Sequence, residues 1–225
     1  AAPDEDARRA AKAMEELLTP ISKAWSTDRA NEVTSLGVQV HGGMGYVEET
    51  GAAQHMRDAR IAAIYEGTNG IQAMDLVGRK LQGDGGAAAG KFIDEVMSEA
   101  GFLKAAKRDD LRLIGERLYA AGEALRSSTD WLLEKAKEDQ VHALAGATPY
   151  LKQFGNVAGG YYLARGAKAA AIAVNEGDDA AYYESKIAIA RFFADNYLTE
   201  AVALTDAVTV GAGGVERIEP DLLSA

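Results

Sequence analysis

Cysteine is absent from the 225-residue chain, which excludes disulfide bonds, thiolate metal sites and a thiol nucleophile. The same absence favours an intracellular, cytoplasmic location. No apolar run approaches the roughly 20 residues that cross a bilayer, and no signal peptide opens the sequence, so we expect no transmembrane segment. The chain begins Ala1-Ala2-Pro3 without a methionine, which suggests a piece of a longer protein.

Positive charge is also in short supply. The 24 lysines and arginines are outnumbered by 34 aspartates and glutamates, which gives a net charge of −10. This balance argues against a nucleic-acid partner or an anionic membrane surface. The three histidines, His41, His55 and His142, lack the spacing of a metal site, so we expect no bound metal.

The chain has only four prolines and few β-branched runs, whereas alanine is abundant. This composition and the spacing of apolar residues predict an all-α fold. One helix is predicted over residues 4–18. Thr19 and Pro20 are typical of a helix N-cap and first turn, so a second helix is predicted to start there and run to about Val40.

Four glycines in "HGGMGYVEETG", residues 41–51, predict a loop. A third helix is predicted over residues 51–64, with Thr50 as its cap. A turn at Tyr65-Glu66-Gly67 follows, and Thr68 is predicted to cap a fourth helix over residues 69–81. The first part of the chain thus reads as four helices.

The segment "GDGGAAAG", residues 83–90, is small, flexible and predicted to be a linker. It divides residues 1–82 from a second helical domain, residues 91–225, which we expect to be an antiparallel bundle of about four helices. Two long apolar stripes at three- and four-residue steps support this bundle. They are Leu111, Ile114, Leu118, Ala121, Leu125 and Leu132, and then Tyr183, Ile187, Ala190, Ala194, Tyr197, Ala201, Leu204 and Val208.

Two short segments carry candidate chemistry. "QVHGGMGY", residues 39–46, puts glycines after a helix, where the backbone could approach a phosphate or a flat cofactor, although an ordinary helix end also uses glycine. "YEGTNGIQ", residues 65–72, sets one carboxylate, Glu66, in a small and apolar turn before a new helix. A turn with a helix cap explains this segment equally well.

The run from Thr19 to Leu81 resembles the C-terminal helical domain of flavin-dependent acyl-CoA dehydrogenases. Two motifs in order carry the resemblance: Gln-Val-His-Gly-Gly, then Arg-Asp-Ala-Arg and Tyr-Glu-Gly-Thr. Residues 91–225 resemble the additional C-terminal helical module of one branch of that family. This branch includes methylthiopropionyl-CoA dehydrogenases and long bacterial fatty acyl-CoA dehydrogenases.

The resemblance implies roles for individual residues. Glu66 matches the catalytic base that removes the α-proton of an acyl-CoA thioester while a hydride leaves the β-carbon for flavin N5. Gly67 matches a substrate-binding position. Two further groups match FAD-binding positions: Gln39, Val40, His41, Gly42 and Gly43, which in the family reach the cofactor of a neighbouring subunit, and Thr68, Asn69 and Gly70.

For the whole protein, the resemblance implies a bacterial enzyme that is at least a homodimer and passes electrons to an electron-transferring flavoprotein. The family's N-terminal helical and middle β-domains are absent from this sequence, so we expect the chain alone to fold but to be inactive. Two alternatives remain open. An acyl-CoA oxidase can share the base motif, and a non-catalytic helical interaction module could retain it.

Overall fold

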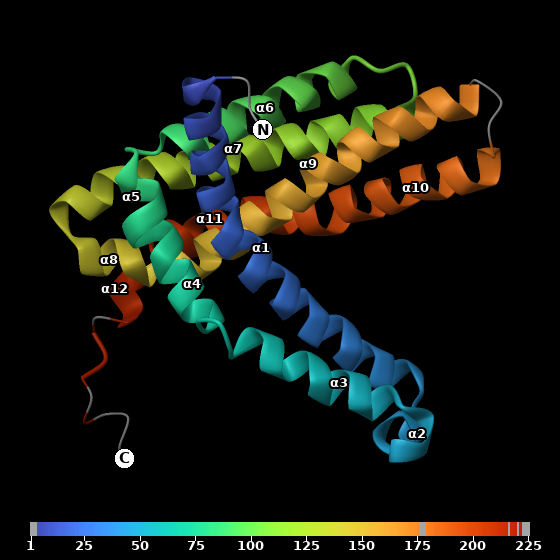
Figure 1. Cartoon of the computed structure of the whole chain (residues 1–225), viewed down its shortest axis with the longest axis horizontal. Helices are drawn as coiled ribbons and strands as arrows, with labels where there is room; N and C mark the ends of the chain where they lie inside the picture. The colour runs from blue at the N-terminus through green and yellow to red at the C-terminus, as the bar shows by residue number, and fades with distance from the viewer. Residues whose placement is uncertain (1–3, 176–178, 216, 220, 222–225) are drawn as a thin grey trace.

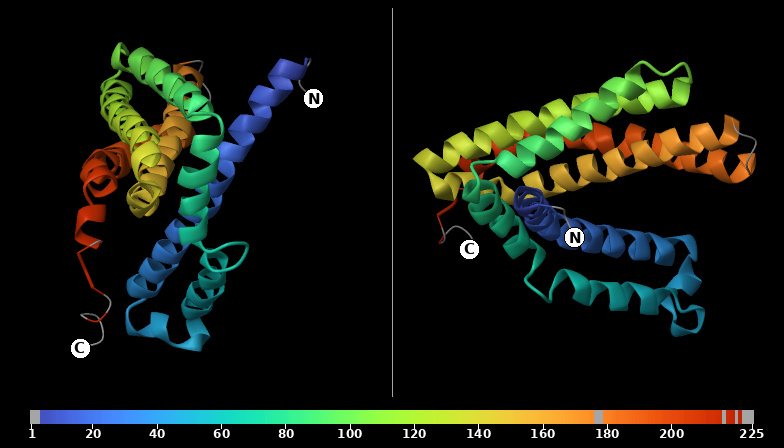
Figure 2. Two further views of the ribbon diagram at one scale, coloured as in Figure 1. Left: turned by 90° about the vertical axis from the view of Figure 1, so that its left-hand side faces the viewer. Right: turned by 45° about the horizontal axis from the view of Figure 1, so that its top comes forward.

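The computed structural model describes residues 4–175, 179–215, 217–219 and 221, and no strand occurs among them. The prediction of an all-α fold is confirmed. The chain forms a long bundle from which a pair of helices extends as an arm (Figures 1 and 2). Among the described residues, no helix is both long and apolar enough to cross a membrane.

Helix α1 (Glu5–Val40) is a single helix, so the predicted break at Thr19-Pro20 is wrong. Asp4 caps it by accepting a hydrogen bond from the Ala7 N–H at 2.7 Å. A proline inside a helix costs about 3 kcal/mol because it removes one backbone hydrogen bond and crowds the preceding turn. Here Pro20 is buried in the same α1 face as Leu17 and Ile21, and this packing offsets the cost.

The second half of α1 lies beside α3 (Ala52–Arg60). Together with the segments that connect them, these two helices form the arm, residues 30–64 (Figures 1 and 2). A short helix α2 (Gly43–Tyr46) and a 3-10 turn η1 (Glu48–Thr50) close its tip, and a 3-10 turn η2 (Ile61–Ala63) ends it. Thr50 is not the cap of α3 as predicted. Its hydroxyl donates to the Met44 carbonyl at 2.9 Å instead, and Gly51 takes the cap position.

Helix α4 (Asn69–Asp75) continues through a π-helical turn η3 (Leu76–Lys80) into α5 (Leu81–Gly83). Thr68 caps α4 as predicted, since its hydroxyl accepts from the Ile71 N–H at 3.4 Å. Helix α6 begins at Ala87, so the second half of the predicted linker is helical. Asp84 accepts hydrogen bonds from the Gly86 and Ala88 N–H groups at the start of α6.

The rest of the described chain forms the C-terminal bundle, in which α6 pairs with α7 and α9 pairs with α10 and α11. Its elements are α6 (Ala87–Lys104), α7 (Asp109–Glu138), α8 (Gln140–Ala145), α9 (Ala147–Asn175), α10 (Ala180–Phe193), the π-helical turn η4 (Ala194–Leu198) and α11 (Thr199–Thr209), followed by α12 (Ala212–Val215).

The predicted stripe on α7 is buried at every position. On α10 and α11, Ile187, Ala190, Ala194, Ala201 and Val208 are buried as predicted, whereas Tyr183, Tyr197 and Leu204 are half-buried. Leu198, not Tyr197, is the fully buried residue after Ala194. The departure is confined to the π-helical turn η4, and the predicted buried positions resume at Ala201.

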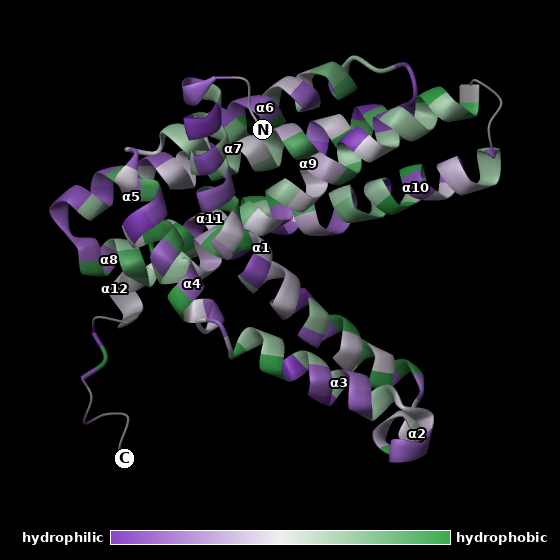
Figure 3. Ribbon diagram, in the orientation of Figure 1, coloured by the Kyte–Doolittle hydropathy of each residue, from purple (hydrophilic) through white to green (hydrophobic). Residues whose placement is uncertain are grey.

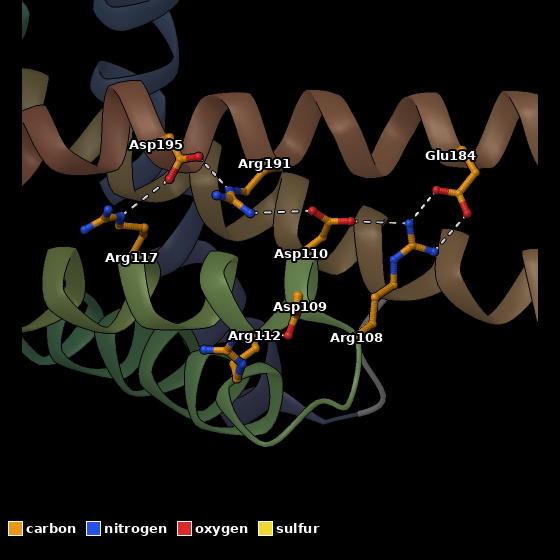
Figure 4. A network of polar contacts seen from close by, with 8 residues as sticks. All are labelled: Arg108, Asp109, Asp110, Arg112, Arg117, Glu184, Arg191 and Asp195. Atoms are coloured by element: carbon orange, nitrogen blue, oxygen red, sulfur yellow. Dashed lines mark hydrogen bonds and ion pairs between the residues drawn. The ribbon is translucent and has the colours of Figure 1, made fainter.

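Ion pairs join the start of α7 to α10 and η4 (Figure 4). They run from Arg108 to Glu184, from Arg191 to Asp110 and Asp195, and from Arg117 to Asp195. The hydrogen bond from Arg108 lowers the pKa of the Glu184 carboxyl. These side chains are partly exposed, so the network contributes little stability.

Residues on both sides of the predicted linker share one hydrophobic core, which extends from Leu17 in α1 to Val208 in α11. The hydropathy pattern follows this arrangement, with apolar segments along the bundle (Figure 3). The arm, which lies outside this core, also contains apolar segments. The division into domains at residues 83–90 stays a prediction.

Candidate active site

The turn that carries Glu66 lies at the root of the arm, where η2 ends and α4 begins (Figure 1). Among the described residues, Glu66 is the one residue other than glycine with a positive φ, 55°, and Gly67 follows at 82°. A left-handed backbone costs an ordinary residue roughly 1–2 kcal/mol. The surrounding contacts must therefore hold Glu66 in this conformation.

Helix α1 supplies those contacts. The Lys23 ammonium donates to the Gly67 carbonyl at 2.7 Å and to Asn69 Oδ1 at 2.9 Å. The Asn69 amide nitrogen in turn donates to Thr27 Oγ1 at 2.9 Å and to Asp28 Oδ1 at 2.6 Å. The hydrogen bonds of the Asn69 side chain therefore link the start of α4 to α1.

The Glu66 backbone is held from the other side by Gln72, whose amide nitrogen donates to the Glu66 carbonyl at 2.9 Å. Within the described part of the chain, the Glu66 N–H has no hydrogen-bond acceptor. The Glu66 side chain is exposed. Large apolar side chains close to it in sequence are also exposed, namely Ile64, Tyr65, Ile71 and Met74. The turn presents a carboxylate and a free N–H on an apolar surface.

The second predicted segment, Gln39 to Gly43, lies at the tip of the arm, so the structure does not bring it near Glu66 within one chain (Figure 1). His41 ends α1, and its Nδ1 lies 2.9 Å from the Gly37 carbonyl. Because a carbonyl only accepts, Nδ1 carries the proton in this contact. Gly42 has a φ of 62°, and all five residues are exposed.

The resemblance predicts Glu66, Gly67, Thr68, Asn69 and Gly70 as site residues, and the structure places the first two in the turn, Thr68 at the cap of α4 and the last two in its first turn. Sequence reasoning missed Lys23 and Thr27, which contact this turn from more than 40 positions away in sequence. Nothing in their local pattern distinguishes them from solvated polar residues of a helix. Among the described residues, no group of three or more histidine, aspartate or glutamate side chains could hold a metal ion.

Comparison with known families matches nearly the whole described chain. Residues 5–81 match the family described as "Acyl-CoA dehydrogenase, C-terminal domain". Residues 90–219 match the one described as "Acetyl-CoA dehydrogenase C-terminal like". Both matches are to C-terminal segments of such dehydrogenases. The chain belongs to the acyl-CoA dehydrogenase family.

Individual relatives agree with this assignment. The chain is 45% identical over 205 residues to the 3-methylmercaptopropionyl-CoA dehydrogenase of Ruegeria pomeroyi, an alignment that covers 91% of this chain and 35% of that protein. It is 31% identical over 202 residues to a broad-specificity linear acyl-CoA dehydrogenase of Mycobacterium tuberculosis, covering 86% of this chain and 33% of that one. The chain thus spans about a third of the length of these relatives.

Another relative aligns with a shorter part of the chain. The short-chain specific acyl-CoA dehydrogenase of Megasphaera elsdenii is 50% identical over 62 residues, which cover 28% of this chain and 16% of that protein. The first two relatives instead align along most of the chain, including the C-terminal bundle.

Proposed function

We propose that this chain is the C-terminal part of an FAD-dependent enzyme that introduces an α,β double bond into an acyl-CoA thioester, with Glu66 as its base. The observation that carries the proposal is the backbone of Glu66, which is held at a positive φ by contacts from α1 and α4. Strain of this kind persists where a side chain must occupy a fixed position, and it is concentrated at functional sites.

The chemistry follows from what the turn offers. The Glu66 carboxylate takes the α-proton, and the electron pair of that C–H bond becomes part of the new double bond. The α-carbon of a thioester is a weak acid, so the carbonyl oxygen must be stabilised as negative charge develops on it. The free N–H of Glu66 would donate to that oxygen. Bound FAD would accept the hydride that leaves the β-carbon.

The residues proposed to contact FAD offer open backbone and a hydroxyl donor to one edge of such a cofactor. A β-carbon at Gly42, Gly43 or Gly70 would meet no atom within 4 Å, so these backbones are open to close approach. Thr68 retains a hydroxyl proton to donate, since its oxygen already accepts from Ile71. The remaining contacts to FAD would come from parts of the enzyme outside this chain.

The separation of the two segments supports the proposal that they serve two cofactors. Gln39, Val40, His41, Gly42 and Gly43 lie at the arm tip and Glu66 lies at its root, so one chain would contribute to the FAD sites of two subunits. This arrangement requires a homodimer or a larger homo-oligomer. We further propose that an electron-transferring flavoprotein accepts the electrons; rapid reoxidation of the reduced enzyme by O2 would instead favour an acyl-CoA oxidase.

The base is tested in the complete flavoenzyme by mixing it rapidly with 3-methylmercaptopropionyl-CoA and following the bleaching of the flavin. Glu66→Gln keeps the size of the side chain but cannot take the proton. We expect the bleaching rate to fall by roughly 10²–10⁴-fold or more. FAD content and thioester binding should be retained, because the backbone N–H is unchanged. Glu66→Asp should be intermediate, since its carboxylate is retracted by one methylene. Bleaching of the Gln variant at the wild-type rate would exclude Glu66 as the base.

A further inference from the structure

The C-terminal bundle contacts α1 through Trp25, a residue that no proposed step uses. The Trp25 indole N–H donates to Asn156 Oδ1 at 2.8 Å. The Trp25 ring also lies beside that of Phe193, with 6.3 Å between centroids. A β-carbon at Gly155 would lie closer than 3.0 Å to three atoms of the Trp25 side chain, so glycine alone fits there. Trp25 is thus held by α9 and α10.

Asn156 fixes this contact from within the bundle. It is fully buried, and its amide nitrogen donates to the Tyr197 carbonyl at 3.2 Å and to Glu200 Oε2 at 2.9 Å. Burial raises the pKa of Glu200, but the hydrogen bonds from Lys152 and Asn156 outweigh it, so the pKa is lowered and the carboxylate stays charged. A buried polar group whose partners are all satisfied has one favourable geometry. The Asn156 amide can therefore hold Trp25 in only one place.

The opposite face of α1 holds the Glu66 turn. Lys23 precedes Trp25 by two residues, which is about 200° around an α-helix. Lys23 and Thr27 reach Gly67 and Asn69 on that face. Helix α1 thus contacts the bundle through Trp25 on one face and the turn through Lys23 and Thr27 on the other, while α4 also packs against α9. We expect a displacement of Trp25 to move Lys23 and Thr27, which hold the turn of Glu66.

We propose that Trp25 is a positioning residue for Glu66, through which the C-terminal bundle sets the place of the base. Trp25 touches no reacting group and acts through α1, Lys23 and Asn69. The inference rests on the proposed function and assigns a role to the bundle within it. Proton transfer is sensitive to such placement, because a misplacement of about 1 Å can cost roughly 10²-fold in rate.

The test compares two glycines of α9 in the complete flavoenzyme. Gly155→Ala introduces a methyl group against Trp25, whereas Gly166→Ala introduces the same group where no atom lies within 4 Å. Both changes raise the helix propensity of α9 equally. We expect Gly155→Ala to slow flavin bleaching by 3-methylmercaptopropionyl-CoA roughly tenfold, with FAD content and thioester affinity retained. Gly166→Ala should match the wild type.

A second variant keeps the test decisive if the Gly155→Ala protein does not fold. Trp25→Phe keeps an aromatic ring but removes the donor to Asn156, and it should slow bleaching in the same way. In a Lys23→Met background, Gly155→Ala should have a smaller additional effect than it has alone, because one of the links between α1 and the Glu66 turn is already broken. Additive rate losses in the double variant would show that Trp25 acts by another route and would overturn the inference.

Two further outcomes separate the inference from the proposed function. If Glu66→Gln is inactive while Gly155→Ala and Trp25→Phe bleach as fast as Gly166→Ala, the positioning role is wrong and the base assignment stands. If Glu66→Gln bleaches at the wild-type rate, the base assignment fails, and the inference fails with it. Loss of FAD or of thioester affinity in parallel with the rate would indicate a merely structural role for Trp25 and also overturn it.

Discussion

The arm and the C-terminal bundle are built from the same kind of helix but bury different residues. The bundle buries large side chains completely, among them Phe92, Leu118, Tyr150 and Phe154. Within the described structure, the buried residues of the arm are all small, namely Gly45, Ala52, Ala53 and Ala63. Most of its large apolar side chains are exposed: Val33, Leu36, Val40, Met44, Tyr46, Met56, Ile61 and Ile64.

This difference indicates that the bundle can stabilise itself, whereas the arm contributes little to its own stability. Local free energies of opening vary within a protein and are lowest where few apolar contacts are buried. The segments that we propose for the cofactor and the base lie at the tip and the root of the arm. The proposed site residues thus lie in or next to the less stable arm, and the more stable bundle supports the arm at its root.

The largest effect should come from removing a core side chain of the bundle. Leu118→Ala removes a fully buried leucine from α7 and should lower the free energy of unfolding by about 2–5 kcal/mol. Leu36→Ala makes the same chemical change on the arm, where the leucine is 55% exposed, and should change it by about 0.5 kcal/mol or less. Urea denaturation of both variants measures the contrast. Equal losses would show that the arm is as tightly packed as the bundle.

A smaller loss of stability should appear at high pH, and its cause should be a tyrosine of the bundle. Burial raises the pKa of Tyr150, whose hydroxyl lies 2.8 Å from Thr129 Oγ1. Because the folded state keeps this proton longer than the unfolded state, its contribution is intact below about pH 10 and falls above it by up to about 1.4 kcal/mol per pH unit.

The matched variants are Tyr150→Phe in the bundle and Tyr46→Phe on the arm, where the ring is 84% exposed. Tyr150→Phe should cost about 1 kcal/mol at pH 7, because a buried hydrogen bond is lost, and should weaken the alkaline loss of stability. Tyr46→Phe should retain that loss. Urea midpoints between pH 7 and pH 11 give the comparison. An unchanged alkaline slope in Tyr150→Phe would assign the effect to other groups.

The smallest effect should come from surface ion pairs. The pKa of Glu184 is lowered by its hydrogen bond from Arg108, so the stability that this pair adds is present above about pH 4.5 and is lost as the pH falls further. Glu184→Gln should therefore flatten the acid side of the stability profile slightly. The arm has a comparable but more exposed pair, Arg57 and Glu48 at 2.7 Å, and Glu48→Gln should change the free energy of unfolding at pH 7 by about 0.5 kcal/mol or less. A steeper acid side in Glu184→Gln would contradict this sign.

Much of the fold could be predicted from sequence because helix periodicity is a local property. The stripe from Leu111 to Leu132 is buried at every predicted position. The failures have tertiary causes. Pro20 stays inside α1 because its face is buried, and Leu198 takes the place of Tyr197 in the core within the π-helical turn η4. Neither compensation can be read from a window of neighbouring residues.

The candidate site divides in the same way. The motif around Glu66 locates the turn and the Thr68 cap, which depend on adjacent residues. The left-handed backbone of Glu66 and its support from Lys23 depend on contacts across more than 40 positions. Trp25 is less predictable still, because its partner Asn156 is 131 positions away. The sequence motifs therefore locate the residues that we propose to carry the chemistry, but not what holds them in place.

The positive φ of Glu66 has a consequence for how this protein could change under selection. Glycine adopts that backbone without the penalty that a glutamate bears. Selection for heat resistance alone would therefore favour glycine at position 66, and selection for turnover would favour the carboxylate. Selection for stability and selection for activity therefore favour different residues at position 66. A screen for more stable variants of this protein would tend to replace its proposed base.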